Sequence, residues 1–81
     1  MNTGIVTSFD RDEGWGTLAS EALPSGALAW VYYSAIEVDG FRELVVGEGV
    51  LFDFERADQD GFRYRATRVI RSEEPSAANV R

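Results

Sequence analysis

The chain is 81 residues long and has a formal net charge of −6, with 14 acidic residues against eight arginines and no lysine. A chain of this length forms one small domain. It contains no cysteine and no histidine, which excludes disulfides, thiolate chemistry and the usual ligands of a zinc site. The acidic balance argues against strong electrostatic binding of polyanions, because neutralised phosphates normally supply most of that affinity.

Cellular location is indicated by what the sequence lacks. The absence of disulfides is consistent with a reducing cytoplasm. The first residues have neither the basic cluster nor the apolar run of a signal peptide. No stretch approaches the roughly 20 apolar residues of a membrane span. We therefore expect a cytoplasmic protein that makes no contact with a membrane.

The first two strands are predicted at residues 3–9, which are rich in β-branched and aromatic side chains, and at residues 14–19. A polar turn at residues 10–14 separates them. Gly14 and Gly16 weaken the second strand intrinsically, so we expect them to mark a close backbone approach or a sharp twist.

A third strand is predicted from about residue 28 to 33, after a loop at residues 21–26 that contains proline and glycine. Residues 34–37 are interpreted as one helical turn. In that turn Ser34 is the expected cap and Ile36 is expected to point inward.

Residues 38–48 are predicted to form a long irregular connection. The fourth strand follows, because Val50, Phe52 and Phe54 alternate with polar or outward positions. Residues 58–61 end in Asp-Gly and are predicted to form a hairpin turn, since glycine supplies the positive φ that tight turns need.

The fifth strand is predicted at residues 62–71. Its apolar positions change parity between Ala66 and Val69, which indicates a β-bulge. The polar residues 72–81 contain a proline and are expected to be a disordered tail, so the folded domain is predicted at residues 1–71.

Five short strands with one helical turn after the third are typical of an all-β fold, a small antiparallel barrel of the OB type. Composition alone leaves an SH3-like barrel as the alternative. If the second and third strands pair, Trp15, Trp30 and Tyr32 gather on one outer surface, where large aromatic side chains need a functional explanation. An aromatic surface on a small β-domain is typical of a platform for stacking nucleic-acid bases.

Several short motifs, in order, are similar to a known family. They are T-G-I-V at 3–6, F-D at 9–10, E-G-W-G-T-L at 13–18, W-V-Y-Y-S-A-I at 30–36, D-G-F-R-E-L at 39–44 and E-G-V-L-F at 48–52. Over about residues 3–70 the chain resembles a cold-shock domain, whose two ribonucleoprotein-like motifs are close to K-G-F-G-F-I and V-F-V-H-F-S-A-I. The resemblance implies a five-stranded barrel that binds single-stranded RNA or DNA by stacking unpaired bases.

The resemblance also implies which positions bind. Aromatic residues persist at five family positions, which are Trp15, Trp30, Tyr32, Tyr33 and Phe41. Two further positions of the same site have lost their rings, because Ser8 replaces an exposed tryptophan and Thr17 replaces a stacking phenylalanine.

Charge at the site also departs from the family. Thr7 and Glu13 replace two lysines, so we expect reduced affinity. The hairpin before Ala66 is longer than in the family.

Inward parity or matching family positions predict a set of barrel-filling residues, which are Val6, Leu18, Val31, Ile36, Val50, Phe52 and Val69.

Other interpretations of the aromatic residues remain open. Trp15, Trp30 and Tyr32 pack under a loop or against a protein partner if they do not stack on bases. Strand alternation would turn Tyr33 inward, so it is interpreted as half core. Phe41 is as suited to capping the barrel as to stacking.

The charged residues are interpreted more simply. Four arginines of the fifth strand are either a phosphate-binding stripe or, as we favour, a solvated face that balances Asp53, Glu55 and nearby acids on the paired strand. These arginines are Arg63, Arg65, Arg68 and Arg71. The acidic cluster at residues 10–13 lacks the loop of an EF-hand, so no metal is predicted.

No nucleophile–base pair and no phosphate-binding loop is present, so no cofactor and no catalysis are predicted. The sequence therefore predicts a single-strand RNA- or DNA-binding protein, acting as an RNA chaperone or expression regulator. The alternative is a module that binds a protein partner or a second copy of itself.

Overall fold

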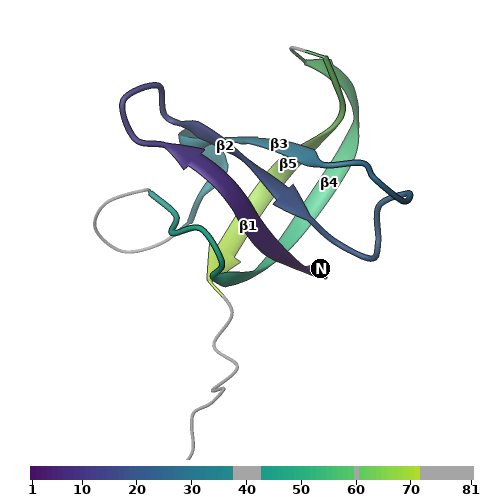
Figure 1. Cartoon of the computed structure of the whole chain (residues 1–81), viewed down its shortest axis with the longest axis horizontal. Helices are drawn as coiled ribbons and strands as arrows, with labels where there is room; N and C mark the ends of the chain where they lie inside the picture. The colour runs from purple at the N-terminus through teal and green to yellow at the C-terminus, as the bar shows by residue number, and fades with distance from the viewer. Residues whose placement is uncertain (38–42, 60, 72–81) are drawn as a thin grey trace, which may run out of the picture.

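The structure is a computed structural model that describes residues 1–37, 43–59 and 61–71. Figure 1 shows its strands arranged as a barrel. A short 3₁₀ helix, η1 (Tyr33–Ala35), comes directly after the third strand. The five strands are β1 (Asn2–Asp10), β2 (Trp15–Ala19), β3 (Ala29–Tyr32), β4 (Gly49–Gln59) and β5 (Phe62–Arg71).

The strands follow the order β1-β2-β3-β5-β4 around the barrel, and pairing of β4 with β1 closes it. The pairs are antiparallel except for β3 and β5, which meet in a short parallel contact at Ala29↔Tyr64 and Trp30↔Arg65. This arrangement confirms the predicted five-stranded barrel of OB type, with the correction that one contact is parallel. The strand order explains the parallel contact. After β3 the chain crosses to β4, on the far side of β5, and returns through the hairpin as β5, which therefore runs in the same direction as β3.

The barrel interior contains every residue that was predicted to fill it. The largest fully buried side chains are Phe52, Leu18, Ile36, Val6, Val31, Val50 and Val69. Strand alternation explains this result, since inward positions of a half-buried strand repeat every second residue. Ile36 lies just beyond η1 and is held against β5 through a bridge to Val69.

The helical turn differs from the prediction at its start. η1 begins at Tyr33, its N-cap is Tyr32, and no side chain caps it, so the expected cap at Ser34 is wrong. The backbone explains the shift: the Tyr33 N–H donates to the Gly14 carbonyl at 2.7 Å, and the Ile36 N–H donates to the Tyr33 carbonyl at 3.0 Å.

The predicted bulge in β5 is confirmed. Asp53 pairs with Arg68 but the next residue, Phe54, pairs with Ala66, which leaves Thr67 without a partner on β4. The hairpin formed by β4 and β5 then extends beyond the other strands (Figure 1).

Gly16 meets the expectation of a close approach. A Cβ atom there would collide with the backbone oxygen of Ser8 and lie 2.8 Å from the Cα of Phe9. Gly14 belongs to the β1–β2 turn rather than to β2, with a φ of 80°. Only β2 with a glycine at position 16 can lie this close to β1.

Some predictions fall on residues that the structure does not describe. Phe41 and the tail at residues 72–81 lie outside the described ranges, so their roles stay predictions. Within the described ranges, no helix has the length and apolar character to cross a bilayer.

Candidate functional site

The pairing of β2 with β3 gathers aromatic side chains on the outside of the barrel. Trp15 lies opposite Tyr32, and Thr17 lies opposite Trp30. The ring centroids of Trp15 and Trp30 are 6.2 Å apart, those of Trp30 and Tyr32 are 5.7 Å apart, and those of Tyr32 and Tyr33 are 4.8 Å apart. We call these four residues, Trp15, Trp30, Tyr32 and Tyr33, the aromatic face.

The aromatic face is open to solvent at its tyrosine end. Tyr32 is 40% exposed and Tyr33 is 44% exposed, whereas Trp15 and Trp30 are half-buried. The Nε1 atom of Trp30 is covered and has no hydrogen-bond partner among the residues described. The indole of Trp30 therefore contributes to the surface through its carbon framework.

Tyr33 is not half core, as strand alternation predicted. β3 ends at Tyr32, so Tyr33 begins η1 and its ring turns outward beside Tyr32. Gly14 makes room for it, since a Cβ atom at position 14 would lie 3.2 Å from the Tyr33 ring. Sequence alternation fails here because a backbone contact with the β1–β2 turn ends the strand.

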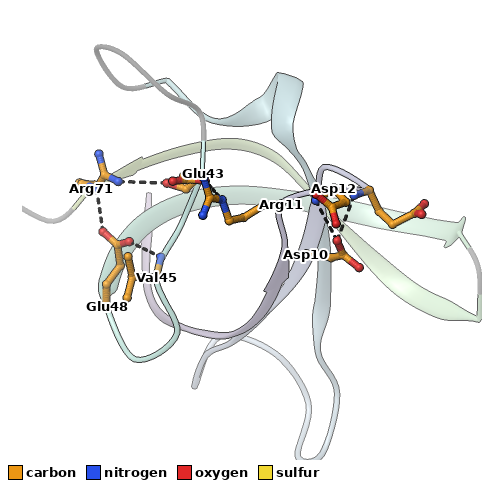
Figure 2. A network of polar contacts seen from close by, with 8 residues as sticks. Asp10, Arg11, Asp12, Glu43, Val45, Glu48 and Arg71 are labelled. Carbon is orange, nitrogen blue, oxygen red and sulfur yellow. Dashed lines mark hydrogen bonds and ion pairs between the residues drawn. The ribbon is translucent and has the colours of Figure 1, made fainter.

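The acidic residues of the β1–β2 turn have a structural role. The Asp10 carboxylate accepts the N–H groups of Asp12 and Glu13 at 2.9 and 3.0 Å, and Figure 2 shows this side chain folded back onto its own turn. No group of three potential metal-ligating side chains occurs in residues 1–37, 43–59 and 61–71. The turn thus supports Gly14, and through it Tyr33, by satisfying its own backbone.

Hydroxyl groups occupy the β1 side of the aromatic face. The Thr17 hydroxyl lies 2.6 Å from the hydroxyls of both Thr7 and Ser8, and the Thr7 hydroxyl donates to the Thr17 carbonyl at 3.1 Å. The register of β1 shifts between Val6 and Ser8. This shift brings the hydroxyls of both Thr7 and Ser8 to Thr17. Thr17 is only 5% exposed, so Ser8 offers a ligand more surface than Thr17 does.

Phe62 also contacts the aromatic face, and the sequence did not reveal it. Its ring lies 6.2 Å from that of Trp15 at an angle of 67°, in an edge-to-face contact. Phe62 has the parity of Tyr64 and Ala66, which point toward the core. The sequence feature that could have predicted this contact was the long hairpin, because Phe62 lies at its end, beyond the residues that pack in the core.

The arginines of β5 are largely neutralised. Within residues 1–37, 43–59 and 61–71, three of the four form ion pairs with glutamates: Arg65 with Glu55, Arg68 with Glu37, and Arg71 with Glu48. This supports the charge-balancing interpretation over a phosphate-binding stripe.

The neutralising contacts come from several parts of the chain. Arg68 Nε lies 2.9 Å from Glu37, and this hydrogen bond and the charge of Glu37 raise the pKa of Arg68 above its ordinary value. Arg71 lies 2.8 Å from Glu48 and also donates to the Glu43 carbonyl at 3.0 Å (Figure 2). These arginines remain charged, but an acid accompanies each of them.

The tyrosine end of the aromatic face adjoins a polar pocket. Its lining includes Tyr32, Tyr33, Arg11, Glu13 and Glu43. The Arg11 guanidinium is 2.7 Å from the Glu43 carboxylate, so its charge is also compensated. A ligand at this end meets ring surface but little net positive charge.

No protein-family model matches the chain, but several curated proteins do. Cold shock protein 1 of Lactiplantibacillus plantarum is 39% identical over 59 residues, which is 73% of this chain and 85% of the relative. Cold shock-like protein CspD of Haemophilus influenzae is 34% identical over 70 residues, covering 86% of this chain and 90% of the relative. Cold shock protein CspC of Bacillus subtilis is 38% identical over 56 residues, covering 69% and 80%.

Proposed function

The chain belongs to the cold-shock protein family, and we propose that it binds single-stranded RNA or DNA by stacking bases on the aromatic face. The supporting observation is the row of four rings on the outside of the barrel, with neighbouring centroids 4.8 to 6.2 Å apart, two half-buried tryptophans and two exposed tyrosines. In the cell such binding would serve an RNA chaperone or an expression regulator.

Stacking is the larger contribution to this binding. Each base stacked on an aromatic side chain contributes roughly 1–3 kcal/mol and tolerates any base, because every base has a π-face. Three stacked bases contribute at most about 9 kcal/mol, close to the roughly 8 kcal/mol of a micromolar Kd, so we expect micromolar or weaker affinity without strong electrostatic attraction. We expect a preference for flexible pyrimidine-rich strands, which expose their bases most readily.

Electrostatic attraction is the smaller contribution. Single-strand binding normally weakens with salt at a slope of about −0.7 per phosphate neutralised. Here Arg65, Arg68 and Arg71 are ion-paired, and the net charge is −6. The salt dependence of binding is accordingly shallow.

The test compares two variants in binding titrations with a labelled pyrimidine oligonucleotide, followed by fluorescence anisotropy. Tyr32→Ala removes an exposed ring of the aromatic face and should weaken binding at least about fivefold, which corresponds to about 1 kcal/mol. Ile5→Ala is the control, because Ile5 is also exposed but pairs with Ala19 and Gly49 instead. Equal affinities of the two variants would contradict binding on the aromatic face.

A further inference from the structure

Phe62 adds a ring from a different element to the row on β2 and β3. It is the first residue of β5 and pairs with Gln59 across the end of the hairpin. Tyr64, two residues further along, packs against the hydrophobic core, whereas Phe62 is not among the residues that do so. Among the residues that the structure describes, the ring that Phe62 contacts is that of Trp15. Core packing therefore does not account for Phe62.

The contact with Trp15 leaves ring surface available. In an edge-to-face pair, the edge of one ring meets one face of the other, so at least three of the four faces stay uncovered by the pair. The angle of 67° between Phe62 and Trp15 corresponds to this geometry. Phe62 is half-buried, so part of its side chain beside Trp15 stays accessible to a ligand.

Phe62 also lines a groove. The lining residues come from the β2–β3 loop, residues 24–28, and from the end of the hairpin turn and the start of β5, residues 61–64. The loop wall is held in a turn, since the Ala27 N–H donates to the Pro24 carbonyl at 2.9 Å. The parallel contact between Ala29 and Tyr64 fixes the two walls relative to each other.

Arg63 is the cation of this groove. It is exposed, and within the described part of the chain it has no ion-pair partner, unlike Arg65 two residues later. A phosphate next to a base stacked on Phe62 would meet a guanidinium that none of the described acidic residues pairs with, and a guanidinium binds phosphate well. The groove therefore combines a ring, a cation and a neighbouring row of rings.

We propose that Phe62 is an additional base-stacking residue, and that a bound single strand continues from Trp15 across Phe62 into the groove, where Arg63 contacts a phosphate. This inference rests on the proposed function. It also implies that the bound strand lies toward the hairpin, because the β1 side of the aromatic face carries hydroxyls at Ser8 and Thr17, whereas the hairpin side carries the ring of Phe62.

The experiment measures affinity as a function of oligothymidylate length for the wild type, Phe62→Ala and Phe62→Tyr. For the shortest strand that binds, the affinity of Phe62→Ala should be within twofold of that of the wild type. For longer strands, the affinity of Phe62→Ala should be at least about fivefold weaker, which corresponds to the loss of one stacked base. Phe62→Tyr keeps a ring and should restore the affinity for long strands.

Arg63 is tested by salt titration with a long strand. Arg63→Gln should reduce the magnitude of the salt slope by about 0.7, the value for one phosphate contact. Arg56→Gln is the matched control, because Arg56 is also an exposed hairpin arginine without an ion-pair partner in the described residues and does not line the groove. Its salt slope should equal that of the wild type.

Several results would overturn the inference. If Phe62→Ala weakens the binding of strands of all lengths equally, Phe62 acts by holding Trp15 in place and not by binding a base. If Phe62→Ala weakens the binding of no strand, Phe62 only shields Trp15 from solvent. If Arg63→Gln and Arg56→Gln have equal salt slopes, Arg63 does not contact a phosphate. A wild type that binds no strand of any length overturns the proposed function as well, and this is seen before any variant is compared.

Discussion

The rings of Trp30 and Tyr32 lie nearly parallel, with an angle of 10° between their planes and centroids 5.7 Å apart. Residues two apart on a strand share a face and are about 6.6 Å apart along it, so these side chains lean together. Thr17, opposite Trp30, carries no ring, and Trp15 is the β2 residue whose ring reaches Trp30. The result is one continuous aromatic surface.

The stability of the barrel depends on Phe52. This side chain is fully buried, and its ring lies 5.7 Å from that of Phe54. Phe52→Ala should lower the free energy of unfolding by about 3–5 kcal/mol, because it removes apolar burial and leaves a cavity. Denaturant unfolding measures this loss, and a change below about 1 kcal/mol would show that Phe52 is not central to the core.

Gly16 should tolerate no side chain. Gly16→Ala places a Cβ atom against the Ser8 backbone oxygen, and backbone cannot move aside as a flexible side chain can. We expect a loss of about 1–3 kcal/mol or more in thermal or denaturant unfolding.

Gly26→Ala is the comparison for Gly16. Gly26 has a φ of 81° with open space around it, so only backbone strain of about 1–2 kcal/mol applies there. A Gly16→Ala variant that is more stable than Gly26→Ala would contradict the close approach of β1 and β2.

The sequence predicted the barrel and its core well, because alternation on β4 and the parity change in β5 depend on local patterns. It misplaced Tyr33, since the end of β3 is decided by a hydrogen bond to Gly14, 19 residues earlier in the chain. It also missed Phe62, whose contact with Trp15 depends on the course of a long hairpin. Both errors involve contacts between distant segments, which periodicity does not encode.

The charge balance of β5 was predicted from the paired strand, and the structure shows wider sources. Glu55 on β4 does pair with Arg65, but Glu37 follows η1 and Glu48 precedes β4. Cross-strand pairing is visible in a sequence once strands are assigned. Partners that come from connecting segments require the tertiary fold.

Glu13 should be the acid whose reversal most improves binding. It lines the polar pocket beside Tyr32 and Tyr33. Glu13→Lys places a cation next to the exposed end of the aromatic face, so it should tighten binding and steepen the salt slope by about 0.7. The control is Glu21→Lys, which makes the same charge change beyond the opposite end of β2. Equal gains from both variants would mean that only net charge matters.

Removing the partner of Arg65 should also tighten binding. Arg65 lies beside Trp30 in the β3–β5 register and is paired with Glu55. Glu55→Gln leaves the guanidinium free for phosphate at a cost of less than about 1 kcal/mol in stability, because the pair is exposed. Oligonucleotide titration against Glu21→Gln measures the gain. An unchanged affinity would place the bound strand away from Arg65.

The most direct measurement of the central claim follows the indole N–H resonances of the two tryptophans. In ¹⁵N-labelled protein, Trp30→Phe assigns the resonances, and a pyrimidine single strand is then titrated into the wild type. The account predicts that both resonances shift saturably with the single strand, and that neither shifts when protein concentration alone is raised. Resonances that stay fixed at high-micromolar oligonucleotide, or that shift with protein concentration alone, would contradict it and assign the aromatic face to protein contact.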